Sequence, residues 1–525
     1  MGQAEPDRPV TRPVPLDRLW PGRTGQISGL SLNSAQVRPG DLYVALPGSR
    51  THGARHIEQA LAGGAVAVLT DQAGVELAGP AVTGAVPFLV SPDPRATMAE
   101  LAAQLYDHPA RRLAMFAVTG TNGKTTTVFC LAALLDGLGL SCATIGTLGF
   151  RLAGRRLPWP HSTVTTPEAP DLQASLAGLV DLGCRAVAIE VSSHALALGR
   201  VSGIDFRAAA FTNLGADHLD YHGSQEAYFE AKASLFDPGR VGTAVIWSDQ
   251  PAGRRLAQRV RAAEGQVVTV GRRPDPGLGR HLAIVGERVD ADGSTLVELA
   301  VAADRVGWTF RLGLPGQHNV SDAALAVGLA WAGGLDPSAG LDRLAQVRVP
   351  GRLQRVDLPT GAPRVYVDFA HTPQAVESAL AALRPGRTIV VLGAGGDRDQ
   401  GKRGPMGAAA VGGADVVIVT DDNPRGEDPA LIRQAVLAGA RQARRLAPAG
   451  SRAAVCRIHD GGARRDAIRL ALQYAMAGDS VAVLGKGHET TQEIGGVSAA
   501  FDDASVVAEE WRELSQRKGS GHGAD

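Results

Sequence analysis

One segment limits the possible folds of this chain more than any other, because an apolar run, a glycine-containing loop and a helical run follow one another without a break. The apolar run covers residues 115–119, the loop covers 120–123, and Lys124 opens a helical run that extends to Leu140. Glycines let backbone N–H groups converge on an anion, and a helix N-terminus adds partial positive charge. A plain glycine turn with an exposed lysine is the alternative. The order of the elements favours a loop that binds the phosphates of ATP, with the Thr125 hydroxyl on Mg²⁺.

Apolar runs of strand length alternate with helical patterns over most of the chain. Such alternation is typical of mostly parallel, doubly wound sheets, and 525 residues are enough for three or four domains of about 150 residues each. Period-two alternation in residues 282–312, around a turn at 290–293, indicates an antiparallel extension of the central sheet. The expected strands cover residues 42–46, 65–69, 88–90, 115–119, 186–191, 208–214, 244–247, 365–369, 389–392, 416–420 and 481–484.

We therefore predict an α/β protein of three domains. Residues 1–112 are expected to form a small N-terminal α/β domain, and residues 113–346 a central domain of the P-loop type on a mostly parallel sheet. Residues 347–525 are expected to form a Rossmann-like α/β domain, because the alternation restarts after Pro350.

The composition argues against several classes of protein. Lys plus Arg and Asp plus Glu each number 53, so the chain lacks the basic excess that non-specific nucleic-acid binding needs. The four cysteines show no CxxC spacing, which fits a reducing compartment. The uncharged runs fall short of the roughly 20 residues that a membrane span requires. We expect a cytoplasmic monomer that binds small molecules, and neither nucleic acid nor membranes.

Acidic and histidine side chains stand where two of the central strands end. Glu190 closes one strand, and the string TNLGADHLDYH, residues 212–222, closes the next. Both groups fall at the C-terminal edge of a parallel sheet, where open α/β sheets bind ligands. A lone histidine is more often a structural hydrogen-bonding residue, which is our interpretation of His222. We expect His218 to be functional.

The string TGTNGKTT, residues 119–126, resembles the nucleotide loop of the Mur ligases, the ATP-dependent amide ligases of peptidoglycan precursor synthesis, and of their relatives the folylpolyglutamate synthetases. The resemblance covers about residues 26–513, and the motifs occur in the family's order. It implies an N-terminal domain that binds the UDP-linked precursor, a central ATPase domain and a C-terminal amino-acid-binding domain. The implied ATP contacts in the loop are Gly120, Thr121, Asn122, Gly123, Lys124, Thr125 and Thr126.

The resemblance also implies a catalytic magnesium site. The family's metal-binding glutamate and histidine map onto Glu190 and His218, beside Thr125. The string YFEAK, residues 228–232, matches the segment in which Mur ligases have a carbamylated lysine, so Lys232 is implied to be N6-carboxylysine. A carbamate offers Mg²⁺ a hard anionic oxygen, which an ammonium cannot. The implied catalytic residues are Lys124, Glu190, His218 and Lys232.

Further nucleotide contacts are implied outside the loop. The string GQHNV resembles the family's HN motif beside the adenine, with Asp322 where a second Asn often follows. Arg suits phosphate because its planar fork donates two parallel hydrogen bonds. The implied contacts are His318, Asn319, Arg352 (on the γ-phosphate), Asp368 and His371.

Contacts to the UDP-linked precursor are implied in two regions. The N-terminal segments flanking RPGDLYVAL resemble the part of the family that binds UDP, although Ala35 stands where the family usually has Arg. The central domain is implied to contact the muramoyl-dipeptide, with Leu198 in place of a polar residue often found there. The implied residues are Leu32, Ser34, Ser49, Arg50, Thr51, Thr165, Thr166, Ser192 and Arg200.

Three C-terminal strings, GGDR, DNPR and GKGHE, resemble the acceptor pocket of the diaminopimelate-adding members of the family. DNPR is the most specific of them, because lysine-adding members typically lack its Arg. A plain turn after a strand is the alternative for DNPR taken alone. The implied acceptor-binding residues are Arg398, Asp422, Asn423, Pro424, Arg425, Gly485 and Glu489.

The resemblance implies that meso-diaminopimelate is added to the D-glutamate γ-carboxylate of UDP-N-acetylmuramoyl-L-alanyl-D-glutamate through an acyl phosphate. Two alternatives remain within this class of enzyme, a lysine-adding Mur ligase and a folylpolyglutamate synthetase-like ligase. The second should lack an N-terminal UDP-binding domain and the DNPR string. A non-catalytic ATP sensor on the same fold is expected to have lost Lys124, Glu190, His218 or Lys232, and all four are present.

Overall fold

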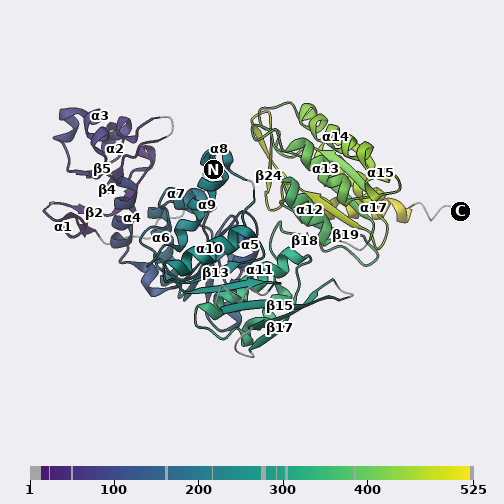
Figure 1. Cartoon of the computed structure of the whole chain (residues 1–525). Coiled ribbons are helices and arrows are strands. Elements are labelled where there is room, and N and C mark those ends of the chain that lie inside the picture. Colours follow the sequence, from purple (N-terminus) through teal and green to yellow (C-terminus); the bar gives the residue numbers. More distant parts are fainter. Residues whose placement is uncertain are drawn as a thin grey trace. The chain divides into compact units, whose positions relative to one another are not determined.

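The computed structural model of the chain describes residues 13–22, 24–48, 51–159, 164–215, 217–273, 280–290, 293–301, 306–383 and 386–520. The chain folds into two compact units, which are drawn in Figure 1. The first comprises Met1–Arg288, Leu296–Arg311 and Ser321–Ala345, and the second comprises Val289–Thr295, Leu312–Val320 and Gln346–Asp525.

The first unit begins with a parallel sheet of four strands in the described chain. In sheet order these are β3 (Gly29–Ser31), β4 (Asp41–Val44), β5 (Ala67–Thr70) and β6 (Phe88–Val90). Leu42 and Val44 pack toward α4 (Pro94–Leu105), whereas Tyr43 between them packs toward α2 (Ile57–Ala62) and α3 (Gln72–Thr83). The smaller elements here are β1 (Val14–Pro15), α1 (Leu16–Leu19), β2 (Gln26–Ile27), η1 (Ser34–Gln36), η2 (Gly53–His56) and η3 (Pro109–Arg112).

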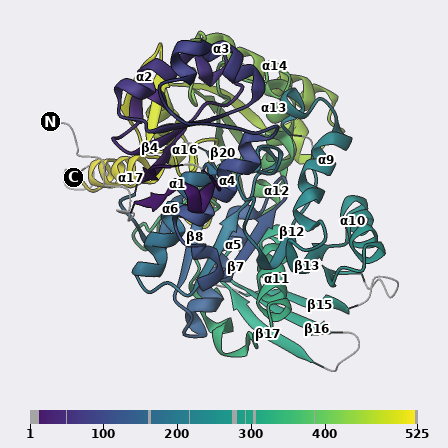
Figure 2. The same ribbon diagram turned by 90° about the vertical axis from the view of Figure 1, so that its left-hand side faces the viewer.

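The larger sheet of the first unit has eleven strands within the described residues, and those from β8 to β15 in the sheet order pair in parallel. β15, β16 and β17 follow one another in sequence and in the sheet (Figure 2), as expected for the extension around residue 290. In sheet order the strands are β10 (Arg155–Arg156), β9 (Gly149–Leu152), β8 (Cys142–Gly146), β11 (Ala186–Glu190), β7 (Ala114–Thr119), β12 (Phe206–Phe211), β13 (Val241–Trp247), β14 (Val267–Gly271), β15 (Arg280–Val289), β16 (Thr295–Val301) and β17 (Gly307–Leu312).

Helices cover both faces of this sheet. Met115 and Ala117 share a core with leucines of α6 and α10 on one face, and Val245 contacts Gly328 of α11 on the other. Strands that are buried on both faces appear as continuous apolar runs in the sequence, which is why the pattern predicted them. The helices are α5 (Lys124–Gly137), α6 (Ala169–Asp181), α7 (Ser193–Ala197), α8 (Leu219–His222), α9 (Gln225–Ala233), η4 (Ser234–Phe236), α10 (Pro251–Ala262), α11 (Gln317–Ala332) and η6 (Ser338–Gln346).

The second unit is built on a sheet of six described strands, of which all but β18 pair in parallel. Its order is β18 (Gln354–Arg355), β19 (Arg364–Asp368), β23 (Ser480–Leu484), β20 (Thr388–Leu392), β21 (Val416–Thr420) and β22 (Arg457–Gly462). The other elements are α12 (Pro373–Ala382), α13 (Arg403–Gly413), α14 (Pro429–Leu446), α15 (Arg452–Val455), α16 (Arg464–Tyr474), the hairpin β24 (Thr491–Ile494) and β25 (Val497–Ala500), and α17 (Asp503–Ser520).

Two separate cores flank this sheet as well. Val417 and Val419 pack with helices α12, α13 and α14, whereas Val416 and Ile418 pack with α16 and α17. The prediction of an α/β fold with mostly parallel sheets is confirmed. Each expected strand is present with bounds shifted by a few residues at most, as for residues 42–46, where the strand is Asp41–Val44. None of the helices in the described residues is both long enough and apolar enough to span a membrane.

Candidate active site

The phosphate loop joins β7 to α5, as the sequence predicted. Gly123 adopts φ +84° immediately before α5, and an added Cβ there would lie 2.3 Å from a carboxylate oxygen of Asp322, so glycine is required. The Lys124 ammonium curls back over the loop and donates to the carbonyls of Gly120, at 2.8 Å, and Thr121, at 2.9 Å. Thr125 and Thr126 lie buried in the first helical turn. The loop is therefore closed by its own lysine.

The end of β12 holds the loop from the side. The Asn122 amide donates to Asn213 Oδ1 at 2.9 Å, and the Thr212 hydroxyl donates to the Asn122 carbonyl at 2.6 Å. The Thr121 hydroxyl accepts from the Gly215 amide at 2.8 Å. The C-terminal ends of β7 and β12 thus meet at one edge of the sheet, where a doubly wound fold places ligands.

Glu190 ends β11 with a carboxylate that is almost fully buried. Its Oε2 accepts from the Thr125 hydroxyl at 2.9 Å and from the Thr147 hydroxyl at 3.1 Å, and its Oε1 accepts from the Thr147 amide at 3.0 Å. A carboxylate and a hydroxyl beside a phosphate loop are hard oxygen donors of the kind that Mg²⁺ prefers. The structure therefore brings two of the four predicted metal-binding residues into contact.

Lys232 lies on α9 with its side chain buried, and its Nζ donates to the Gly120 carbonyl at 2.9 Å. The same carbonyl accepts from Lys124, so two amines lie on one side of the loop. Burial lowers the pKa of Lys232 well below its ordinary value, and the nearby Lys124 lowers it further. Lys232 also lies 4.4 Å from the centre of the Tyr228 ring, whose hydroxyl is 3.2 Å from that of Thr121.

His218 and His222 belong to a group of rings that pack edge to face beside α9. The ring of His194 lies 4.8 Å from that of His218 and 5.4 Å from that of His222. His222 Nε2 is 2.9 Å from the Ser193 hydroxyl. From the sequence, we interpret His222 as a structural hydrogen-bonding residue. His218 is half-exposed, adopts φ +53° and lies 3.6 Å from a carboxylate oxygen of Asp217.

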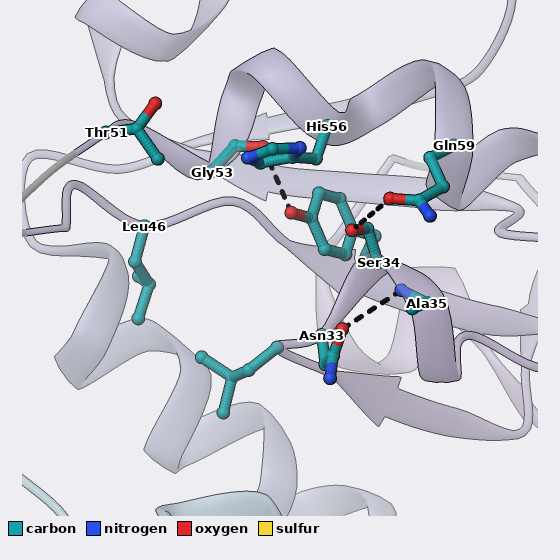
Figure 3. Close-up of a pocket in the computed structure, with 10 residues that line it drawn as sticks. Asn33, Ser34, Ala35, Leu46, Thr51, Gly53, His56 and Gln59 are labelled. Atoms are coloured by element: carbon teal, nitrogen blue, oxygen red, sulfur yellow. Dashed lines mark hydrogen bonds between the residues drawn. The ribbon is translucent and has the colours of Figure 1, made fainter. Parts of the chain in front are cut away.

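The N-terminal sheet has a pocket of about 440 Å³ at the ends of β3 and β4 (Figure 3). The Ser34 hydroxyl donates to Gln59 Oε1 at 2.8 Å, and Asn33 Oδ1 accepts from the Ala35 amide at 3.0 Å. The predicted Leu32, Ser34 and Thr51 line it, whereas Ser49 and Arg50 lie outside the described residues. The full lining is Leu32, Asn33, Ser34, Ala35, Tyr43, Leu46, Thr51, Gly53, His56 and Gln59.

The residues expected to contact the muramoyl-dipeptide lie around the end of β11. Thr166 donates to the Glu190 carbonyl at 2.9 Å and accepts from the Ser192 amide at 3.1 Å. Arg200 donates to the Thr166 carbonyl at 2.9 Å and pairs with Glu168 at 2.7 Å. The Thr165 hydroxyl accepts from that of Thr147 at 3.4 Å. These four predicted residues and Glu190 therefore form one connected group, with Leu198 just after α7.

In the second unit, the residues expected to contact the nucleotide lie around the end of β19 and in the first turn of α11. Asp368, at the end of β19, accepts from the amides of Leu353, at 2.6 Å, and Ala370, at 2.8 Å. Burial raises the pKa of Asp368, and the neighbouring Arg352 opposes that shift. The guanidinium of Arg352 lies 4.8 Å from the centre of the Phe369 ring, and His371 Nδ1 lies 2.8 Å from the Phe369 carbonyl. His318 and Asn319 lie in the first turn of α11, where Asn319 Nδ2 donates to the Pro315 carbonyl at 2.7 Å.

The three C-terminal strings meet at one edge of the second sheet. Asn423 Nδ2 donates to Glu489 Oε2 at 2.7 Å, and an added Cβ on Gly485 would lie 2.2 Å from Asp422 Oδ2. Burial raises the pKa of Glu489, and the carboxylate of Asp422 raises it further. The Arg425 guanidinium donates to the Gly396 carbonyl at 2.6 Å, and an added Cβ on Gly395 would meet both Arg425 and Arg398. Pro424 is buried beside them.

Some residues in these groups have no recognisable sequence signal. His56, the last residue of η2, and Gln59 of α2 line the N-terminal pocket. Thr147 holds Glu190 from the turn between β8 and β9, and the hairpin of β24 and β25 holds Arg425, whose amide donates to the Glu493 carbonyl at 3.0 Å. Each depends on a contact between distant segments, so no local pattern could have indicated it.

Family descriptions match three segments of the chain. Residues 26–113 match "Mur ligase family, catalytic domain", residues 118–330 match "Mur ligase middle domain", and residues 351–487 match "Mur ligase, glutamate ligase domain". The chain belongs to the Mur ligase family. The matched segments contain the phosphate loop and the strings GGDR and DNPR, and the last of them ends within GKGHE.

Individual Mur ligases are similar over almost the whole chain. A protein of Streptomyces avermitilis named UDP-N-acetylmuramoyl-L-alanyl-D-glutamate–2,6-diaminopimelate ligase is 44% identical over 494 residues, 93% of each chain. A protein of the same name from Corynebacterium glutamicum is 41% identical over 489 residues, which are 92% of this chain and 91% of the relative. A solved structure described by that name is 32% identical, covers 96% of this chain and 100% of its own, and has a TM-score of 0.67.

In this Mur ligase, the described residues hold no group of three or more His, Cys, Asp or Glu side chains suited to a metal ion. Among the predicted magnesium ligands, only Glu190 and His218 belong to those four residue types. Thr125 and a carbamate on Lys232 would supply further oxygen ligands beside the Glu190 carboxylate. The contact between Thr125 and Glu190 fits a hard cation, because both groups offer oxygen.

Proposed function

We propose that this Mur ligase adds 2,6-diaminopimelate to the D-glutamate γ-carboxylate of UDP-N-acetylmuramoyl-L-alanyl-D-glutamate, with hydrolysis of ATP, in peptidoglycan precursor synthesis. The observation that supports this best is the identity of 44% over 93% of the chain to a ligase of that name. Members of the family are ATP-dependent ligases, and the chain has their phosphate loop. The meso isomer is our proposal for the acceptor.

In the reaction that we propose, the substrate γ-carboxylate attacks the γ-phosphorus of ATP, and ADP leaves. The resulting acyl phosphate is attacked by an amine of diaminopimelate, and phosphate leaves as the amide forms. The protein acts mainly by positioning and by neutralising charge, as phosphoryl transfer generally requires.

We propose that Lys124 turns from its loop carbonyls to the transferring phosphoryl group. Its ammonium reaches the carbonyls of Gly120 and Thr121, so it already lies at the mouth of the loop. The proposed nucleotide contacts from the second unit are Arg352 on the γ-phosphate, with Asp368, His371, His318 and Asn319.

We propose that Thr125, Glu190, His218 and a carbamate on Lys232 would hold Mg²⁺, which when bound would neutralise phosphate charge. Carbamate formation needs an unprotonated amine, and the burial of Lys232 beside Lys124 favours that form. Charge on the carbamate would also replace the repulsion between two amines by attraction.

For the acceptor, we propose that Arg398, Asn423 and Arg425 bind the distal carboxylate of diaminopimelate, and that Glu489 binds its distal ammonium. The support is the single cluster that Asn423 and Glu489 form at the edge of the second sheet. The proposed contacts to the UDP-linked precursor are those of the N-terminal pocket together with Thr165, Thr166, Ser192 and Arg200.

The experiment that tests this function is phosphate release by the purified protein with ATP, magnesium and each combination of UDP-precursor and amino acid. We expect release only when UDP-N-acetylmuramoyl-L-alanyl-D-glutamate and diaminopimelate are both present. Release with lysine instead would support the lysine-adding alternative, and release with a folate and glutamate would support the folylpolyglutamate alternative.

We also propose the domain limits 1–112, 113–346 and 347–525, supported by the family matches to 26–113, 118–330 and 351–487. We further propose that the enzyme is cytoplasmic and monomeric. The cysteine spacing and substrates found in the cytosol support the cytoplasmic location. Light scattering after size-exclusion chromatography tests the oligomeric state, and a dimer mass would contradict it.

A further inference from the structure

Arg464 is a buried arginine in the second unit that the proposed mechanism leaves unused. It is the first residue of α16, directly after β22, and its side chain has no exposed surface. Arginine is almost never fully buried unless it is paired. The partners of this side chain therefore indicate why it is there.

Asp503, the first residue of α17, is the main partner and is also fully buried. Arg464 Nε donates to one carboxylate oxygen of Asp503 at 2.7 Å, and Nη2 donates to the other at 2.6 Å. Nη2 also donates to the Leu484 carbonyl, at the end of β23, at 3.0 Å. This bidentate geometry fixes the plane of the guanidinium.

The remaining nitrogen, Nη1, faces the acceptor cluster. It lies 3.9 Å from Asp422 Oδ2, and these two buried atoms have no hydrogen-bond partner in the described structure. A separation of 3.9 Å permits attraction between the charges but is too long for a hydrogen bond. Asp422 Oδ2 therefore keeps its capacity to accept a hydrogen bond.

Asp422 needs a positive neighbour, because a second carboxylate lies close to it. The charge of Asp422 contributes to the raised pKa of Glu489, and Lys486 Nζ, itself fully buried, lies 3.5 Å from Glu489 Oε2. Lys486 thus offsets Glu489, and Arg464 offsets Asp422. Without a cation behind it, Asp422 would turn away from the like charge of Glu489.

We infer that Arg464, anchored by Asp503, is a positioning residue that holds Asp422 in place and thereby sets the DNPR loop for the acceptor amino acid. The inference rests on the proposed function for the identity of that acceptor. Asn423 follows Asp422 directly and Arg425 lies two residues further along the same loop, so a shift of Asp422 moves both. Arg464 acts through Asp422, and no contact between Arg464 and a substrate is part of the inference.

A purely structural alternative is that Arg464 only joins α16 to α17. The chain offers a matched control for it, because a second set of ion pairs links the same helices, with the partly exposed Arg465 and Arg469 both paired to the buried Glu510. Arg465 pairs with Glu509 at 2.8 Å and with Glu510 at 2.9 Å, and Arg469 pairs with Glu513 at 3.5 Å. Arg469→Ala weakens this link without touching Asp422.

The test compares steady-state kinetics of Arg464→Met/Asp503→Leu, Arg464→Lys, Arg469→Ala and the parent, measured by phosphate release. The double variant removes both buried charges together, which is generally far less damaging than removal of one partner. We expect its KM for diaminopimelate to rise about 10- to 100-fold, the cost typical of losing a group that orients a ligand-binding residue. Its KM for ATP and its kcat should stay within about threefold of the parent, and Arg469→Ala should match the parent in all three.

An unchanged KM for diaminopimelate in a folded double variant would overturn the inference, as would an equal rise in Arg469→Ala. Arg464→Lys keeps a positive charge but loses the fork, so we expect an intermediate KM. It decides the question if the double variant does not fold. Should the parent prefer another amino acid, the proposed function fails, and the same comparison with that amino acid still tests Arg464.

Discussion

The phosphate loop of the first unit and the acceptor cluster of the second have opposite excesses of charge. Lys124 and Lys232 donate to the same carbonyl, and Lys124 makes Lys232 less favourable as a cation. Asp422 and Glu489 form the reverse case, with a raised pKa on Glu489 caused first by burial and then by Asp422. Groups of like charge are placed together at a cost in stability, and a ligand of opposite charge removes that cost.

The difference indicates the charge of each expected ligand. Two amines beside a loop of converging amides suit the phosphates of ATP, whereas two carboxylates suit an ammonium group. Arg398 and Arg425 near Gly395 add a positive edge to the second region. The acceptor region can therefore bind both charges of an amino-acid end, whereas the loop region is suited to phosphates and to the cation that Thr125 and Glu190 would hold beside them.

The largest effect is expected for Lys124→Ala, which removes positive charge from the loop. Loss of one preorganised charged donor should lower kcat on the order of 10³-fold, which corresponds to about 4 kcal/mol of activation free energy. The Lys124 ammonium is needed most in the transition state, when charge develops on the phosphoryl group. Thermal unfolding should be unchanged, since Lys124 is only partly buried. Turnover near that of the parent would contradict the account of the first region.

Lys232→Ala tests whether the second amine of that region acts as a carbamate. We expect kcat to fall by between about 10² and 10³, with partial recovery when a small carboxylic acid at high concentration supplies the missing anion. Intact-protein mass and high-resolution density of the parent are the direct measurements. An unmodified Lys232 in a fully active preparation would contradict the carbamate.

The contrast between the two regions also explains what the sequence could predict. The loop from Gly120 to Lys124 is one contiguous segment between a strand and a helix, so its structure follows from local sequence. The cluster of Asn423 and Glu489 joins segments 66 residues apart, and only the family resemblance linked them. Arg464 and Asp503 showed no signal at all, because a charged residue in an amphipathic helix is normally expected to be exposed.

The residues that line the N-terminal pocket were predictable from the sequence only in part. Ser34 and Thr51 were predicted from strings that flank β4, whereas His56 and Gln59 line the same pocket from a region without a motif. The α/β alternation predicted most of the parallel strands, because strands buried on both faces are continuously apolar, but it did not single out β8, β14 or β22. Strand ends were less predictable, since the last residue depends on pairing with a neighbour.

Arg425→Ala tests the positive edge of the acceptor region. Hydrogen bonds to charged groups contribute about 1.5 kcal/mol or more each, so loss of two should cost about 3 kcal/mol with diaminopimelate, roughly 10²-fold in kcat/KM. Lysine lacks the distal carboxylate and should lose little. The ratio of kcat/KM for the two amino acids should narrow accordingly, and an unchanged ratio would contradict this use of Arg425.

The smallest effect is expected from pH in the same region. A carboxyl with a raised pKa takes up a proton at a higher pH than an ordinary glutamate, so Glu489 should lose its charge as pH falls through a window above the usual range. KM for diaminopimelate should then rise about tenfold for each unit of pH below that window. Glu489→Gln should raise KM and remove the dependence on pH. A parent-like pH profile in that variant would assign the dependence to another group.

The raised pKa of Glu489 also predicts how the stability of the folded protein changes with pH. Because its folded pKa is raised, the native protein binds more protons than the unfolded chain between the two pKa values. Stability should therefore fall slightly as pH rises through that window, and Glu489→Gln should flatten this part of the profile in urea unfolding.

The most direct measurement is phosphate release by the unaltered protein with UDP-N-acetylmuramoyl-L-alanyl-D-glutamate, ATP and magnesium, with diaminopimelate or L-lysine at equal concentration. The positive edge of Arg398 and Arg425, which lysine leaves unpaired, predicts a rate with diaminopimelate about 10² to 10⁴ times higher. Equal rates with the two amino acids would contradict the proposed acceptor, even if the ligase activity itself were present.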